Sequence, residues 1–316
     1  MKKTILAIVI ISSLIFTGCS LSDDDNVLEG NGGEVTSQNL AGNLTTDLTL
    51  RSGVAHNLIG TLLVKSGSTL TIEAGTIIKG AEGQLASASA LVVAQGGKLM
   101  AEGTAEKPII FTSVLDNITY DQKVGTNLKK TDNEKWGGVV ILGKAKSSTE
   151  NGDTEGNIEG IPASDGYGKY GGADDADNSG TLKYVRIEFP GIPLQPNQEI
   201  NGLTLAGVGS GTTIDYIQVS YSGDDSYEWF GGAVNAKHII AHRGWDDDFD
   251  TDNGYKGKVQ FAVSLRDPAI ADQSGSNGFE SDNDATGTGA TPATHPIFSN
   301  VSVFGPYCNP SISANN

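Results

Sequence analysis

Residues 217–238 read IQVSYSGDDSYEWFGGAVNAKH, residues 239–260 read IIAHRGWDDDFDTDNGYKGKVQ, and the two segments carry the same pattern. Ile217 falls on Ile239 at an offset of 22 residues. The same offset aligns the turn and strand that follow, with Asp224 on Asp246, Asp225 on Asp247, Tyr227 on Phe249, Glu228 on Asp250 and Gly232 on Gly254. After a slightly longer coil, Phe279–Asn283 enters as a third copy, aligned with Phe249–Asn253. An internal repeat of this kind predicts a stack of similar structural units.

The length of the repeat indicates the type of stack. Apolar segments of three or four residues, such as Leu62–Val64 and Leu70–Ile72, recur between glycines along the chain. Strands this short suit a coil in which each strand pairs with its equivalent in the next coil, about 4.8 Å away. Leucine-rich repeats share the period but need Leu and Asn in a fixed frame, and a propeller blade needs about 40 residues. We therefore predict an all-β fold, a right-handed parallel β-helix solenoid with apolar residues stacked inside.

The predicted strands fall into two aligned series, and two long insertions interrupt them. One series comprises residues 184–187, 216–219, 238–241, 260–263 and 300–303, and the other comprises residues 138–141, 202–205 and 232–234. The insertions, residues 116–134 and 147–180, are polar and rich in turn-forming residues. Long loops in compact domains are often functional. We expect them to project from the coils and to wall a groove.

The first residues have the features of a lipoprotein signal peptide. Lys2 and Lys3 precede an apolar run, residues 4–16, that is short for a bilayer span. The segment Phe16-Thr17-Gly18-Cys19 resembles the lipobox of bacterial lipoproteins, with Phe16 where Leu is usual. We predict removal of residues 1–18 and lipidation of Cys19, with an ordinary secretory signal as the alternative. Two or more acyl chains would give stable anchoring, here in the outer membrane.

Residues 19–40 are predicted to be a tether between the lipid and a β-helix domain at residues 41–316. Ser20–Asn26 contains three aspartates and resembles the surface-export signal of Bacteroidetes lipoproteins. The alternative is a solvated acidic tether. The first interpretation places the protein on the cell surface. Because a β-helix that ends without a cap exposes a sheet edge, we also expect the sequence to be a fragment truncated soon after Phe304.

Charge and cysteine content limit the partners. The net charge is −17, and loss of Lys2 and Lys3 brings it to −19. Nucleic acid is therefore excluded as a partner of the domain, whereas divalent cations are favoured. After lipidation of Cys19, only Cys308 remains as a thiol, so stability must come from packing rather than from disulfides.

Several segments resemble known β-helix proteins. Residues 69–78 (TLTIEAGTII), residues 97–112 (GKLMAEGTAEKPIIFT) and Trp136-Gly137-Gly138 are similar to right-handed β-helices of the pectin-lyase-like superfamily. Residues 158–162, 170–172 and 178–188 resemble a group of large Bacteroidetes lipoproteins with little assigned function. The resemblance covers roughly residues 45–305. It implies the fold and the bacterial group, and it says almost nothing about activity.

The acidic turn is the first candidate for a functional site. Five carboxylates lie within seven residues, namely Asp246, Asp247, Asp248, Asp250 and Asp252. The repeat stacks Asp225 over Asp247, and two like charges about 5 Å apart repel by roughly 1 kcal/mol in water. Ca²⁺ takes six to eight oxygen ligands and would compensate this repulsion, so we predict that these five residues bind Ca²⁺. The alternatives are plain turn chemistry, which Asp, Asn and Gly favour, and a catalytic site.

Candidate catalytic residues follow from the same repeat. Ser222-Gly223-Asp224-Asp225 loosely resembles the Asp pair of β-helix glycosidases, and glycoside hydrolysis uses paired carboxylates. The companion motifs of those families are missing from the sequence. A Ca²⁺-dependent lyase would also need a basic residue, for which Arg243 and Arg266 are placed by the repeat. The alternative for both arginines is ion pairing with the acidic turns.

Aromatic residues flank the acidic turns. Trp229, Trp245 and Tyr221 are predicted to contact a glycan, because aromatic faces stack on sugar rings. Tyr227 and Phe249 occupy one aligned position and are expected in the core. The sequence thus favours a surface-displayed, Ca²⁺-stabilised module that binds a polysaccharide or another envelope component. A Ca²⁺-dependent polysaccharide lyase or glycoside hydrolase and a structural stalk are the alternatives, because a fold does not by itself settle a function.

Overall fold

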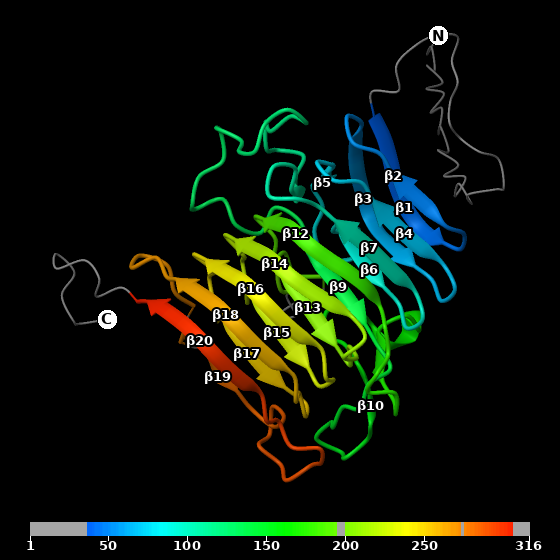
Figure 1. Cartoon of the computed structure of the whole chain (residues 1–316), viewed down its shortest axis with the longest axis vertical. Coiled ribbons are helices and arrows are strands. Elements are labelled where there is room, and N and C mark those ends of the chain that lie inside the picture. Colours follow the sequence, from blue (N-terminus) through cyan, green and yellow to red (C-terminus); the bar gives the residue numbers. More distant parts are fainter. Residues whose placement is uncertain (1–36, 195–199, 273–274, 306–316) are drawn as a thin grey trace, which may run out of the picture.

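The computed structural model describes residues 37–194, 200–272 and 275–305 (Figure 1). The predicted signal peptide, Cys19, most of the predicted tether and Cys308 lie outside these ranges. Twenty strands and two short 3-10 helices are described, and none of these helices is long and apolar enough to cross a membrane. The strands are β1 (Ser37–Leu44), β2 (Leu48–Leu50), β3 (Ala55–Val64), β4 (Thr69–Ile72), β5 (Ile77–Gly80), β6 (Ala90–Val93), β7 (Lys98–Glu102), β8 (Ile109–Ser113), β9 (Val139–Leu142), β10 (Glu155–Asn157), β11 (Lys169–Gly171), β12 (Gly180–Glu188), β13 (Leu203–Ala206), β14 (Thr213–Ser220), β15 (Tyr227–Phe230), β16 (Asn235–His242), β17 (Phe249–Asp252), β18 (Lys258–Leu265), β19 (Glu280–Ser281) and β20 (Ile297–Phe304).

Eighteen of these strands form a right-handed parallel β-helix, as predicted (Figure 1). Three columns of parallel strands run along the solenoid. Column A contains β2, β4, β7 and the first halves of β12, β14, β16, β18 and β20. Column B contains the first halves of β1 and β3, then β5 and β8, then the second halves of β12, β14, β16, β18 and β20. Column C contains the second halves of β1 and β3, then β6, β9, β13, β15, β17 and β19.

The observed register confirms the repeat found in the sequence. Ile217 pairs with Ile239, Tyr227 with Phe249 and Glu228 with Asp250. The third copy is also confirmed, since Asp250 pairs with Glu280. The first four residues of β1, Ser37–Leu40, fall inside the range predicted to be tether.

Alternation of side chains builds a single apolar interior. In β15, Tyr227 and Trp229 are fully buried, because residues two apart on a strand share a face. Tyr227 stacks on Phe249 of the next coil with ring centroids 5.7 Å apart, and Trp229 stacks on Tyr255 at 5.4 Å. Large rings therefore fill this part of the core, whereas aliphatic side chains fill the core of the coils from β1 to β7.

In the five coils that contain β12, β14, β16, β18 and β20, columns A and B meet at a sharp corner made by one residue. These residues, Tyr184, Tyr216, His238, Phe261 and Asn300, have left-handed φ angles of 50–61°. The rings of the first four stack on one another with centroids 4.4, 4.3 and 5.0 Å apart. Since a non-glycine residue in this conformation is strained, we infer that the stacking offsets part of that cost. A ring stacked on both sides presents only its edge to solvent.

We expect Tyr216→Val to lower the free energy of unfolding by about 2–3 kcal/mol. The ring contacts with Tyr184 and His238 are lost, each worth about 0.5–1.5 kcal/mol, and a β-branched side chain suits the left-handed conformation less well than Tyr does. Tyr216→Asn is the matched control, because Asn tolerates this conformation and already occupies the corner at position 300. Denaturant unfolding of both variants tests the account, which is wrong if the Asn variant loses as much stability as the Val variant.

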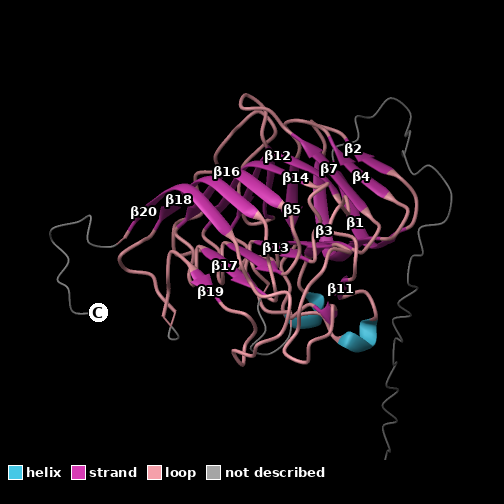
Figure 2. Cartoon of the chain, turned by 60° about the horizontal axis from the view of Figure 1, so that its bottom comes forward, coloured by secondary structure: helices cyan, strands magenta, loops and turns pink. Residues whose placement is uncertain are grey.

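The two predicted insertions connect columns B and C and columns C and A. Residues 114–138 join β8 to β9 and hold no strand or helix. Residues 143–179 join β9 to β12 and contain the antiparallel pair β10–β11 and the 3-10 helix Ala163–Asp165. Figure 2 shows both short helices near β11, on the side of the solenoid away from β12.

Candidate functional site

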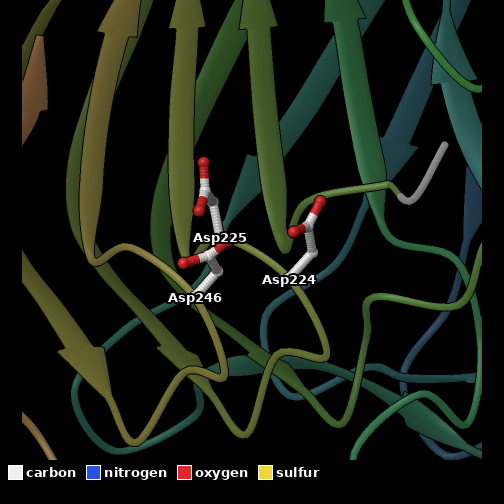
Figure 3. A group of neighbouring side chains, drawn as sticks. All are labelled: Asp224, Asp225 and Asp246. Atoms are coloured by element: carbon white, nitrogen blue, oxygen red, sulfur yellow. The ribbon is translucent and has the colours of Figure 1, made fainter. Parts of the chain in front are cut away.

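The acidic turns lie where column B passes into column C. Asp224 and Asp225 precede β15, and Asp246 and Asp247 precede β17 in the next coil. The amide N–H of Asp247 donates to Oδ1 of Asp225 at 2.8 Å, and the amide N–H of Ser226 donates to the carbonyl oxygen of Asp247 at 2.9 Å. The predicted vertical stacking of these turns is therefore present. Figure 3 shows Asp224 and Asp225 on one turn and Asp246 on the turn beside it.

Two carboxylate triads share Asp225. Asp224, Asp225 and Asp246 each offer an oxygen within 4.8 Å of the others, and so do Asp225, Glu228 and Asp250. We call the second triad, Asp225, Glu228 and Asp250, the buried triad, because Asp225 and Glu228 are only 8% and 7% exposed. No Lys or Arg forms a salt bridge with any of its three members within the described parts of the chain. Three acids are thus packed together without a basic partner.

Burial and mutual repulsion make these acids hard to ionise. Removal from water raises the pKa of Asp225 and of Glu228 well above their usual values, and the neighbouring acids raise them further. Burial also raises the pKa of Asp250 to about 7 and that of Asp247 to about 8. At neutral pH the site therefore needs either protons or a cation to offset its negative charge.

A buried amide faces the buried triad. The side chain of Asn201, 1% exposed, precedes β13 and directs its Nδ2 group to Oε2 of Glu228. Its Oδ1 atom is buried without a hydrogen-bond partner, and so is Oδ1 of Asp250. Because the two ends of an amide are nearly identical in shape, a rotation of this group would turn Oδ1 toward the carboxylates. The site then offers oxygen ligands from three coils.

The five aspartates predicted to bind one ion do not converge. Oδ1 of Asp248 accepts from Nη1 of Arg266 at 3.2 Å, and the carboxylate is fully buried. Asp247 accepts from the amide N–H of Asn277, and Asp252 lies two residues beyond Asp250 along β17. Asp246 and Asp250 belong to different triads. Glu228 and Asn201 were not among the predicted ligands. The alignment of Glu228 with Asp250 in the repeat was a signal that could have identified Glu228.

The two candidate catalytic arginines pair with other acids. Arg243 lies 3.6 Å from Oδ2 of Asp267, which also accepts from Lys130 at 2.8 Å. Arg266 pairs with Asp248. The alternative of ion pairing with the acidic turns is observed for Arg266, whereas Arg243 pairs with Asp267, which follows β18 and lies outside those turns.

Three aromatic residues were predicted to contact a glycan, and for one of them, Trp229, the prediction is wrong. Trp229 is fully buried in the core, so no face is open to a ligand. Trp245 is 36% exposed beside the turns. Tyr221 lies at the end of column B, stacked on Phe189 at 5.0 Å and tilted against His242 at 5.1 Å.

Comparison with known proteins supports the architecture. Residues 42–314 match the family model described as a pectate-lyase-like β-helix domain. No curated protein and no solved structure gives a match. The matched region covers the solenoid from the end of β1 to β20, including the acidic turns and both insertions. The chain therefore belongs to the family of pectate-lyase-like β-helix domains.

Proposed function

We propose that this protein is a lipid-anchored, surface-displayed β-helix that binds a glycan and carries Ca²⁺ in its acidic coils. The observation that supports the proposal is the buried triad with the partnerless Oδ1 atom of Asn201 beside it. The anchor is the lipid predicted on Cys19, and the surface location follows from the acidic segment behind it.

Ca²⁺ fits the chemistry of the residues present. It prefers carboxylate and amide oxygens and tolerates irregular geometry, which suits ligands drawn from neighbouring coils. Asp225, Glu228, Asp250 and the reoriented amide of Asn201 would supply ligands, and water would complete the set. Because the ion binds the folded state, it would add about 2.7 kcal/mol of stability at a concentration 100 times its Kd.

Binding is favoured over catalysis because the arginines that a lyase would need pair with Asp248 and Asp267. One observation keeps a Ca²⁺-dependent lyase or glycoside hydrolase as the second candidate. Asp250 and Asp247 have pKa values raised to about 7 and about 8, the range useful for a general acid at neutral pH.

We expect 1 mM Ca²⁺ to raise the Tm of the chain, purified without its signal peptide, by at least 5 °C relative to the same chain in chelator. At about 2–4 °C per kcal/mol for a domain of this size, that shift corresponds to ligand stabilisation of this order. Asp225→Asn should abolish the shift, because Asp225 belongs to both triads. Asp215→Asn is the matched control, since Asp215 pairs with His238 in column A. An unchanged Tm in chelator contradicts the metal proposal.

The glycan proposal is tested separately, on the same protein. We expect saturable binding to at least one member of a panel of neutral and acidic bacterial polysaccharides, without release of new reducing or unsaturated ends. Calorimetry measures the binding, and absorbance at 235 nm with reducing-end analysis measures turnover. Turnover that is lost in Asp225→Asn would replace the binding proposal with the enzymatic one.

A further inference from the structure

A small groove lies on the outer face of column B, on the other side of that column from the core. Its floor consists of the outward side chains of three neighbouring strands, with Arg186 and Glu188 on β12, Gln218 and Ser220 on β14, and His242 on β16. Val124 and Leu128 of the first insertion form its wall. The cavity measures about 140 Å³. At roughly 30 Å³ per water molecule, it has room for four or five waters or for one compact ring.

The insertion that forms the wall is held against the sheet at two places. Nη1 of Arg186 donates to the backbone carbonyl of Lys123. Nζ of Lys130 donates to Oδ2 of Asp267, which follows β18, at 2.8 Å. A loop fixed at both ends of the groove keeps the cavity open before a ligand arrives, which lowers the cost of binding.

The groove is polar, and its lining residues carry one more carboxylate than cation, because Asp116 lines it together with Arg186 and Glu188. Arg186 forms a salt bridge with Glu188, so their charges cancel. Burial lowers the pKa of His242 below its usual value, and the ring is therefore uncharged at neutral pH. This excess of negative charge disfavours a phosphate or a uronate, and the carboxylate of Asp116 already accepts from the hydroxyl of Thr112 at 2.9 Å and from the amide N–H of Ile118 at 3.0 Å.

The hydrogen-bonding groups of the groove are mixed. Gln218 and Ser220 can each donate and accept, and Glu188 accepts. The buried Nε of Arg186 has no hydrogen-bond partner among the described residues, so one donor there remains to be satisfied. Adjacent hydroxyl groups, each of which donates and accepts, match such a set. Tyr221 and Phe189, stacked at 5.0 Å, provide an apolar border at one end.

We propose that this groove binds one neutral, hydroxyl-bearing sugar ring of a glycan. The inference rests on the proposed glycan-binding function and names the place and the class of sugar. The sugar ring would bind on the outer face of column B, whereas the acidic site lies in the turns between columns B and C.

Two variants and one control test the groove. Leu128→Trp should fill the cavity and weaken binding at least tenfold. Gln218→Ala removes one hydrogen-bonding side chain and should weaken binding roughly threefold to tenfold. Gln260→Ala removes a glutamine on the outer face of β18 that contacts Asn300 and should leave binding unchanged. The probes are methyl glycosides of glucose, galactose and mannose, with methyl galacturonoside as the charged comparison and with any polysaccharide that the wild type binds.

Saturation-transfer NMR and calorimetry on the Ca²⁺-loaded chain distinguish the outcomes. Neutral glycosides that bind and are weakened by both groove variants support the inference. A polysaccharide that binds the wild type and both groove variants equally overturns the groove and leaves the proposed function standing. Preference for the uronoside overturns the neutral assignment. Absence of any polysaccharide binding overturns the proposed function itself.

Discussion

Replacing Arg266 with Met is expected to lower the free energy of unfolding by about 3–5 kcal/mol, because it leaves a charge buried without a partner. The side chain of Arg266 is 7% exposed and that of Asp248 is fully buried. Nη1 of Arg266 also donates to the backbone carbonyl of Asp246, so the arginine holds the acidic turn in place. Denaturant unfolding in chelator measures the effect without a contribution from metal.

Two further variants separate the buried charge from general loss of packing. Arg266→Met combined with Asp248→Asn should recover more than half of the lost stability, because the uncompensated charge is gone. Lys256→Met breaks the pair with Asp175, whose members are 32% and 39% exposed, and should cost less than about 1 kcal/mol. If the double variant is no more stable than Arg266→Met, the loss comes from packing and the ion pair is not its cause.

The repeat in the sequence was sufficient to predict the coil and much of its register. An offset of 22 residues placed Asp225 beside Asp247 and Glu228 beside Asp250, and both contacts are present. Such inference works in a solenoid because each residue contacts mainly its equivalents in the adjacent coils. Vertical neighbours are therefore encoded in the sequence.

Column A was not predicted as a separate series, for a local reason. In β14 and its equivalents, columns A and B are joined by a single corner residue, and that residue is Tyr, His, Phe or Asn rather than Gly. No turn signal marks the boundary, because stacked rings stabilise a conformation that glycine usually supplies. A ladder of corner aromatics recurring with the repeat is the signal that was available.

The candidate site was predicted less completely than the fold. Trp229 follows Tyr227 by two residues, so the alternation of a strand already placed it in the core with Tyr227. Asn201 and the partner of Arg243 carry no such signal. Asn201 comes from the turn before β13, outside the aligned copies, and Lys130 reaches Asp267 from an insertion. Contacts made by irregular segments are not encoded in a repeat.

Without Ca²⁺, the protein is expected to become less stable as the pH rises from 5 to 8. An unfolded aspartate has its usual pKa of 3.8, whereas in the folded protein burial raises the pKa of Asp250 to about 7 and that of Asp247 to about 8. Between these values the folded state binds more protons than the unfolded state, so stability falls with rising pH. At about 1.4 kcal/mol per pKa unit, Asp250 alone, which crosses about two units between pH 5 and its folded pKa, gives a loss of roughly 3 kcal/mol, and Asp247 adds to it.

Calcium should reverse this dependence, because a cation competes with protons for the same oxygens. Urea unfolding at pH 5, 6, 7 and 8, in chelator and in 1 mM Ca²⁺, measures both curves. Glu228→Gln combined with Asp250→Asn removes two acids of the buried triad and serves as the reference for all other titrating groups. The wild type should be more stable in Ca²⁺ than in chelator mainly at pH 7 and 8, and the double variant at no pH. If the chelated wild type gains stability with pH in parallel with the double variant, the triad is ionised without a cation, and the physical reason for placing Ca²⁺ there is lost.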